Sequence, residues 1–363
     1  MQREKIQDSP LFQKCLYFLS SIGYDEAMEI IVILIVVLGL LFDYTNGFHD
    51  AANVVSTVIA TRVLAPVSAI VMAGVLNFLG ATQISGVAQT ITSGLIDSQA
   101  ATQIIVLAAV IGAIIWNLLT WFYGIPSSSS YALVGGLLGS ALANPHTQKV
   151  LWGGVLTKVL IPMVISPLLG FALSYLLMKF LQFLCRKDSV AHELSIFRHL
   201  QIGSACFVAL AHGLNDAQKS MGIITLGLLA GGVIVTPQIP IWVIFACAVT
   251  MAAGTASGGM RIIKTMGFQI TKIDTMQGFA AEASASIVIL GASFLGMPIS
   301  STQMIAGSIT GVGSAKGMHT VKWDVPQKLI IAWVLTLPGA GLVSAGACFL
   351  LNFFLPSSPS FIP

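Results

Sequence analysis

Residues 104–123 read IIVLAAVIGAIIWNLLTWFY, twenty positions without a charged side chain. They lie inside a longer segment, residues 98–148, that contains no Asp, Glu, Lys or Arg. Three further segments of this kind are residues 63–96, 220–260 and 283–315. A helix that crosses a bilayer needs about 20 apolar residues, and every one of these segments is longer. They predict an all-α polytopic membrane protein in contact with the lipid bilayer.

The composition excludes several other classes of protein. Of the 363 residues, 56% are apolar and 9% are Asp, Glu, Lys or Arg, against about a quarter charged in soluble domains. A soluble enzyme, a nucleic-acid binder and a secreted disulfide scaffold are therefore excluded. A transmembrane barrel is excluded as well, because its strands would alternate polar and apolar residues over segments of about ten residues. The net charge of +3 implies no nucleic-acid partner, and the five scattered cysteines indicate neither a metal framework nor a disulfide framework.

Two polar motifs occur twice. Residues 47–53 read GFHDAAN and residues 213–219 read GLNDAQK, an offset of 166. Residues 124–130 read GIPSSSS and residues 296–302 read GMPISST, an offset of 172. Since both motifs recur in the same order at nearly the same offset, the sequence predicts two homologous repeats.

The predicted organisation has five parts. These are an N-terminal interfacial segment 1–29, a first repeat 30–180, a linker 181–199, a second repeat 200–355 and a C-terminal tail 356–363. Basic residues gather around the linker, which predicts a cytoplasmic location: Lys179, Arg186, Lys187 and Arg198. The N-terminal segment carries three basic and five acidic residues, and we expect it on the periplasmic side. Each repeat then crosses the membrane an odd number of times, which gives the inverted-topology repeats of secondary transporters.

The number of membrane segments is expected to be about 10–12. The clear apolar spans are 30–43, 66–86, 104–123, 150–178, 200–228, 239–259, 279–295 and 327–355. The motif segments 47–61, 126–143 and 298–313 are shorter and rich in Gly and Ser, which predicts broken or re-entrant helices at the midplane. Non-helical backbone at this depth occurs only where it is buried in protein or lines a cavity. The motifs therefore mark the binding site.

Asp50 and Asp216 occupy the same position in the repeated motif. A carboxylate inside the membrane costs several kcal/mol by insertion estimates unless it is paired or solvated. Each Asp is therefore a candidate cation ligand or proton carrier. The alternative is a helix N-cap, and an Asp at a helix break could combine both roles.

Each serine cluster follows a Gly-Xaa-Pro turn and precedes an apolar run. This pattern is typical of a helix N-terminus, where unpaired N–H groups and hydroxyls suit an oxyanion. The alternative is that the hydroxyls only bond the backbone or pack between helices. Together, the carboxylates and the helix N-termini predict a cation-coupled anion symporter.

Other candidates carry less information. Glu282 either balances charge in the pathway or sits at the membrane interface. His49 and His212 raise a metal hypothesis, since His212 and Asp216 are spaced i, i+4, as in a zinc hydrolase. The sequence has no HExxH motif, and the serines have no GxSxG elbow, so neither this enzyme nor an intramembrane protease is favoured. Arg261, Lys264 and Lys272 with Asp274 resemble a cytoplasmic loop.

Six segments carry a resemblance to a known family. They are 43–53 DYTNGFHDAAN, 211–220 AHGLNDAQKS, 258–267 GGMRIIKTMG, 278–282 GFAAE, 296–303 GMPISSTQ and 332–338 AWVLTLP. Over residues 30–350 the chain resembles the inorganic phosphate transporters called PiT, which are related to type III sodium–phosphate cotransporters. The resemblance implies a homodimeric importer of orthophosphate in the bacterial inner membrane. It further implies coupling to H⁺ or Na⁺, no cofactor, no metal other than transported sodium, and a cytoplasmic regulatory partner at the linker.

The resemblance also implies site residues. Cation coupling falls on Asp50, Asn53, Asn215 and Asp216, and phosphate binding falls on Ser128, Ser129, Ser130, Ser300, Ser301 and Thr302. His49 and Lys219 depart from the family pattern, because sodium-coupled members commonly have Asn at the first position and the second motif ends in Asn. An ammonium at position 219 could replace a bound cation or contact phosphate. We therefore hypothesise coupling to protons or to fewer sodium ions. Because Lys219 opposes protonation of Asp216, Asp50 or His49 is the expected proton carrier, and His49, Lys219 and Glu282 are modulators.

Three other readings stay open. Some relatives of the family carry sulfate, which, unlike phosphate at pH 7, cannot donate a hydrogen bond. A metal–phosphate complex is a second candidate substrate. An intramembrane hydrolase is the alternative from another class, and the sequence favours it least.

Overall fold

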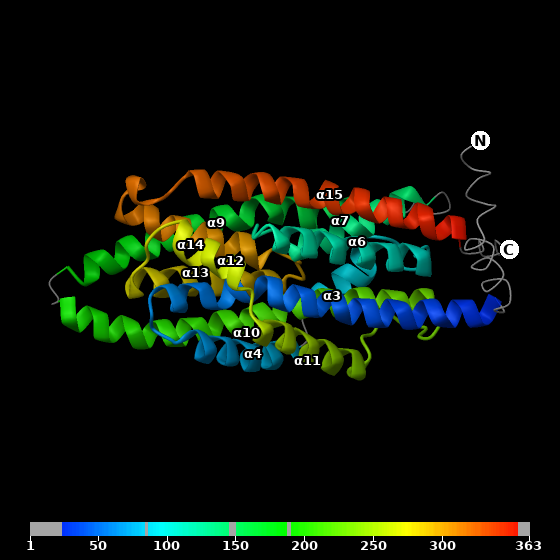
Figure 1. The fold of residues 1–363 in the computed structure, drawn as a ribbon, viewed down its shortest axis with the longest axis horizontal. Coiled ribbons are helices and arrows are strands. Elements are labelled where there is room, and N and C mark those ends of the chain that lie inside the picture. The colour runs from blue at the N-terminus through cyan, green and yellow to red at the C-terminus, as the bar shows by residue number, and fades with distance from the viewer. Residues whose placement is uncertain (1–23, 84–85, 145–149, 187–189, 355–363) are drawn as a thin grey trace.

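A computed structural model describes residues 24–83, 86–144, 150–186 and 190–354. These ranges are helical and contain no strand, only an isolated bridge between Ile96 and Val150. The long helices run along one axis as an elongated bundle, in which α3 begins and α15 ends at the same end (Figure 1). The all-α prediction is confirmed. Most of the predicted N-terminal segment and the C-terminal tail 356–363 lie outside the described residues.

The two halves of the chain contain a similar succession of elements, which differs just before the last helix of each half. The first half contains α3 (Tyr24–Ala60), α4 (Pro66–Ala81), α5 (Gly86–Gln89), η1 (Thr90–Gly94), α6 (Gln103–Phe122), α7 (Ser129–Ala143), α8 (Trp152–Gly154), η2 (Val155–Leu160) and α9 (Ile161–Leu184). The second contains α10 (Val190–Ala230), α11 (Ile241–Ser257), α12 (Met260–Lys264), η3 (Thr265–Gln269), α13 (Thr275–Phe294), α14 (Ser301–Lys316), η4 (Met318–Thr320) and α15 (Asp324–Phe354). The segments η1, η2 and η3 are π-helical, and η4 is a 3₁₀ turn.

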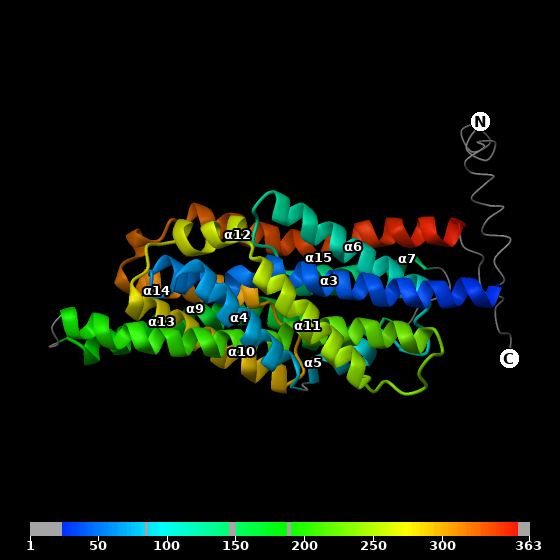
Figure 2. The same cartoon turned by 60° about the horizontal axis from the view of Figure 1, so that its bottom comes forward.

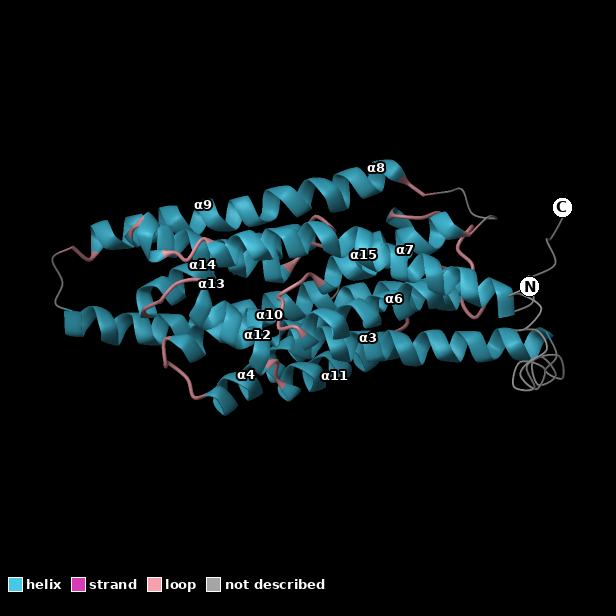
Figure 3. Ribbon diagram, turned by 45° about the horizontal axis from the view of Figure 1, so that its top comes forward, coloured by secondary structure: helices cyan, strands magenta, loops and turns pink. Residues whose placement is uncertain are grey.

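Corresponding helices run in opposite directions and exchange partners. In Figure 1, α3 and α9 run toward the end where α9 and α10 meet, whereas α10 and α15 run away from it. α7 packs against α15, and its counterpart α14 packs against α9, as Figure 3 shows for the second pair. α3 packs on α11 and α10 on α4, and α4 also contacts α11 on one side of the bundle (Figure 2). The inverted relation of the repeats stays a prediction, which these directions support.

Several helices are long and apolar enough to cross a bilayer. Within the described ranges four do so singly: Met28–Ala60, Gln103–Phe122, Trp152–Leu184 and Asp324–Phe354. Two bent pairs, α4 with α5–η1 and α11 with α12–η3, raise the number to six, and the second pair bends by 59°. Counting α7, α10, α13 and α14 as well would give ten, the lower bound of the expected 10–12.

The prediction that the helix breaks at residues 47–61 is wrong. α3 and α10 pass through the Asp motifs without interruption. The motif glycines instead permit close helix crossings: a Cβ on Gly47 would lie 2.5 Å from the Met251 carbonyl oxygen, and one on Gly213 would lie 2.2 Å from that of Asn77. The glycines therefore reflect packing of α3 on α11 and of α10 on α4.

The breaks before the serine helices are confirmed. α7 begins at Ser129 and α14 at Ser301, each after extended backbone. Gly124 and Gly296 take φ values of +67° and +66° in the preceding turns, a conformation that favours glycine. The linker 181–199 is largely helical, because α9 runs to Leu184 and α10 begins at Val190.

Candidate functional site

Asp50 and Asp216 meet in the interior of the bundle. Asp50, Asp216 and His212 each bring one ligand atom into a cluster whose members lie within 4.8 Å of one another. The three side chains are 0–2% exposed. Both carboxylates project from the interior of a continuous helix, α3 or α10, so the alternative that they are N-caps is wrong.

Asp50 contacts the serine loop of the other half. Thr302 Oγ1 donates to Asp50 Oδ1 over 3.2 Å, and His49 Nδ1 lies 2.8 Å from the same oxygen. Asn53 Nδ2, one turn further along α3, donates to Ser301 Oγ at 3.2 Å and to Thr302 Oγ1 at 2.9 Å. The first Asp motif is thus bonded directly to the N-terminus of α14.

Asp216 forms a buried ion pair with Lys219. The ammonium of Lys219 also donates to Ser130 Oγ at 2.5 Å and to the Ile299 carbonyl at 2.9 Å. Three oxygen partners match the three N–H donors of an ammonium. Ser130 Oγ lies 3.4 Å from Asp216 Oδ1, so this motif is bonded to the N-terminus of α7.

His212 lies between α4 and the Asp216 carboxylate. Its Nδ1 lies 3.3 Å from Asn77 Oδ1, and Asn77 Nδ2 donates to Thr255 Oγ1 at 2.8 Å. Thr255 Oγ1 in turn donates to the Met251 carbonyl at 3.0 Å. His212 Nε2 lies 3.2 Å from Asp216 Oδ2. The imidazole therefore bridges α4 and the central carboxylate.

Two of the predicted serines cap helices, and a third has a hydroxyl without a hydrogen-bond partner within the described ranges. Ser128 and Ser300 are N-caps, since their Oγ atoms accept from the backbone N–H groups of Tyr131 at 3.2 Å and Gln303 at 3.3 Å. Ser129 Oγ has no hydrogen-bond partner within the described ranges. All six predicted hydroxyl residues are at most 2% exposed. The two helix N-termini approach the carboxylates, and their role in oxyanion binding stays a prediction.

Two predicted residues lie beside the cluster and not in it. Glu282 is buried between α13 and α10, where it accepts from Ser204 Oγ at 2.5 Å and Gln201 Nε2 at 3.2 Å. It is therefore fully buried in the protein interior. Asn215 donates to Ser293 Oγ at 2.7 Å, which links α10 to α13.

Asp43 and His212 are two buried residues near the centre whose place there the motifs did not predict. Asp43 is fully buried, and neither carboxylate oxygen has a hydrogen-bond partner in the part of the chain that the structure describes. A second acid in the same apolar helix, two turns before Asp50, was the available signal. His212 was weighed only as a zinc ligand, although its i, i+4 spacing from Asp216 already placed both on one helix face.

Comparison with known proteins identifies the family of this chain. The model of the "Phosphate transporter family" matches residues 46–344. A "Probable low-affinity inorganic phosphate transporter" of Mycobacterium tuberculosis (strain ATCC 25618 / H37Rv) is 44% identical over 329 residues, 89% of this chain and 78% of that protein. The protein of the same name in Bacillus subtilis (strain 168) is 40% identical over 330 residues, 90% and 99% of the two chains.

A solved structure described as "The sodium-dependent phosphate transporter" shares the fold. Its TM-score is 0.80 at 25% identity, and the match covers 90% of this chain and 100% of that one. The family and the relatives are transporters and not enzymes. With a helical fold that supports several membrane crossings and two motif pairs meeting at its centre, this chain belongs to the phosphate transporter family.

Proposed function

We propose that this protein imports inorganic phosphate across a bacterial inner membrane as a cation-coupled symporter that works by alternating access. The observation that carries the proposal is the central cluster. In it, a carboxylate from each half lies against the N-terminus of a serine helix from the opposite half. The proposal includes a periplasmic N-terminus, a cytoplasmic 181–199 linker and a homodimer, as the family resemblance implies.

Phosphate would bind between the N-termini of α7 and α14. Helix N-termini attract oxyanions through free N–H groups and partial positive charge. Ser129 has an uncommitted hydroxyl, and Ser130, Ser301 and Thr302 would exchange their present partners for phosphate oxygens. Asp50 beside Thr302 supplies an acceptor that a phosphate O–H can use and sulfate cannot. This acceptor favours phosphate over sulfate.

The coupling ion that fits this cluster best is a proton. Lys219 is held by a carboxylate, a hydroxyl and a carbonyl oxygen, which are ligand types that hard cations use, so its ammonium takes the place of one ion. His212 Nε2 faces Asp216, and an imidazole nitrogen is a poor ligand for sodium but a good proton carrier. We assign coupling to Asp50 and His212, with Asp216 held by Lys219 and His49 as a modulator.

The test is uptake of radiolabelled phosphate into proteoliposomes with an imposed pH gradient or an imposed sodium gradient. Uptake driven by the pH gradient alone, with little competition from sulfate, is expected. Uptake that needs sodium would reject the proton as the coupling ion. Accumulation of sulfate without phosphate would overturn the substrate.

The Lys219→Asn variant tests the role of the ammonium. If Lys219 replaces an ion, removing it should create sodium-stimulated uptake in a protein that shows none, measured as the ratio of initial rates with sodium and with choline. Lys179→Asn, which changes a lysine far from the cluster, is the matched control. A Lys219→Asn variant with unchanged cation dependence would contradict the assignment.

A further inference from the structure

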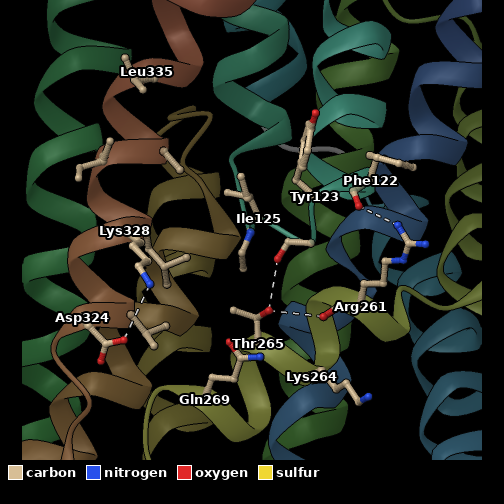
Figure 4. Close-up of a pocket in the computed structure, with 16 residues that line it drawn as sticks. Phe122, Tyr123, Ile125, Arg261, Lys264, Thr265, Gln269, Asp324, Lys328 and Leu335 are labelled. Carbon is tan, nitrogen blue, oxygen red and sulfur yellow. Dashed lines mark hydrogen bonds and ion pairs between the residues drawn. The ribbon is translucent and has the colours of Figure 1, made fainter.

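A notch of about 710 Å³ opens on the surface beside the first serine loop. It is bounded by the C-terminal end of α6, by α12 and η3, and by the first turns of α15 (Figure 4). Phe122 and Tyr123 at its rim are 62% and 66% exposed. The elements around it lie in the half of the molecule in which α9 ends and α10 begins (Figure 1).

The charges around the notch are unbalanced. Arg261, Lys264 and Lys328 line it, with Asp324 as the carboxylate among its lining residues. Lys328 Nζ lies 4.0 Å from Asp324 Oδ2, a loose and exposed contact that contributes little. Two positive charges are left uncompensated, and a cationic concavity of this kind concentrates anions.

The inner wall of the notch is the turn that leads into the serine helix. Its carbonyl groups, in residues 122–126, accept three hydrogen bonds from elements of the second half. Arg261 Nη1 donates over 2.7 Å, Thr265 Oγ1 over 3.2 Å and Trp333 Nε1 over 3.1 Å. The serine cluster begins at the next residue, Ser127, so this turn is the partition between the notch and the central site.

The corresponding turn of the other half shows what holding the loop requires. Thr90 Oγ1 donates to the Gly296 carbonyl at 2.6 Å, and Lys158 Nζ donates to the Leu295 carbonyl at 2.8 Å. A threonine and one basic side chain therefore suffice to hold such a turn, the roles that Thr265 and Arg261 fill at the notch. Within the described residues, neither Lys264 nor Lys328 donates a hydrogen bond to this turn. Their ammonium groups are therefore available to a bound anion.

We propose that the notch is an outlying binding site for a phosphate group, with Lys264 and Lys328 as its main anion contacts. Lysine is a flexible point charge that suits a phosphate in transit. The phosphate group expected is that of inorganic phosphate moving between the central site and the aqueous phase, because the notch adjoins the serine turn. An anionic lipid headgroup offers the same chemistry. The inference rests on the proposed function, and the experiment separates the two.

The experiment compares wild-type protein with Lys264→Gln/Lys328→Gln, and uses Lys322→Gln, an exposed lysine outside the notch, as the matched control. Phosphate exchange is measured in proteoliposomes of neutral phosphatidylcholine, titrating phosphate on one side at a time. The double variant should raise the apparent KM about five- to tenfold on one face only, since exposed charge contacts are individually weak. The apparent KM on the opposite face and the Lys322→Gln values should stay within twofold.

A second arm adds phosphatidylglycerol to the vesicles. If the lipid headgroup is the ligand, phosphatidylglycerol should raise the wild-type KM on that face, and the double variant should abolish this effect. Equal KM values for wild type and double variant on both faces, in both lipids, would overturn the notch site.

Two further results distinguish failure of the proposed function from failure of the notch site. A wild-type protein that moves no phosphate refutes phosphate transport. Equilibrium dialysis of the detergent-solubilised protein with radiolabelled phosphate still tests the notch, because the double variant should lose one class of weak sites that Lys322→Gln keeps. Identical binding isotherms would reject the notch.

Discussion

Asp50 and Asp216 occupy equivalent motif positions but have different partners. Asp216 is compensated by a cation that belongs to the protein, Lys219. Asp50 has a hydroxyl and an imidazole as partners, and the residue corresponding to Lys219 is the neutral Asn53. The same backbone therefore presents one carboxylate that is paired with a fixed ammonium and another that is not.

The serine loops repeat this asymmetry. Ser130 accepts from Lys219, whereas Ser301 accepts from Asn53. A neutral amide is easier to displace from a hydroxyl than a buried ammonium, since charge-assisted hydrogen bonds are about twice as strong as neutral ones. We infer that Lys219 fixes the geometry around Ser130, whereas the contacts of Asp50 exchange more readily.

The largest effect is expected from Asp50→Asn. Removal of the mobile-ion carboxylate should lower phosphate uptake by about a hundredfold, the equivalent of roughly 3 kcal/mol of charged contact. Thermal stability should stay near that of wild type, because no fixed cation loses its partner. Initial uptake rates and detergent melting curves measure both. Near-normal uptake would remove Asp50 from the coupling site.

Asp216→Asn should act mainly on stability. It leaves the ammonium of Lys219 buried without a counter-charge, which is expected to cost about 3–5 kcal/mol of the free energy of unfolding. Asp216→Asn/Lys219→Asn removes both charges and should recover most of that loss. Denaturant unfolding in detergent micelles measures the difference. If the double variant is no more stable than the single one, the ion pair does not have this role.

The close helix crossings at Gly47 and Gly213 test whether the two halves are packed equally tightly. Gly47→Ala and Gly213→Ala each force a Cβ against a backbone carbonyl of a neighbouring helix, so each should cost about 1–3 kcal/mol. Gly203→Ala, where a Cβ meets nothing within 4 Å, is the matched control. A glycine substitution that proves neutral in one half would show that this crossing is looser than its counterpart.

The smallest effect is expected from single hydroxyls. Ser129→Ala removes an uncommitted hydroxyl, and it should raise the KM for phosphate about threefold with unchanged stability, as one neutral hydrogen bond predicts. Ser140→Ala, a buried serine further along α7 that bonds the Leu137 carbonyl, is the control. Phosphate titrations of the uptake rate give the comparison. An unchanged KM in Ser129→Ala would leave this hydroxyl out of the binding site.

The sequence by itself determined the membrane class, because charge-free segments longer than 30 residues have no place on a water-facing surface. It also determined the pairing of the motifs and the start of the serine helices, since Pro and Ser act locally at a helix N-terminus. Asp50, Asp216 and the serines could be selected as one site on these grounds.

Other features depended on contacts between distant segments. A glycine in an apolar helix looks the same whether it breaks the helix or admits a neighbour, and only the packing of α11 on Gly47 distinguishes the two. The contacts of His212 with Asn77 and of Asn77 with Thr255 join three different helices. The fixed cation beside Asp216, the orphaned carboxylate of Asp43 and the notch beside the serine turn were likewise decided by tertiary structure, because burial and charge compensation are properties of the assembled bundle and not of any one segment.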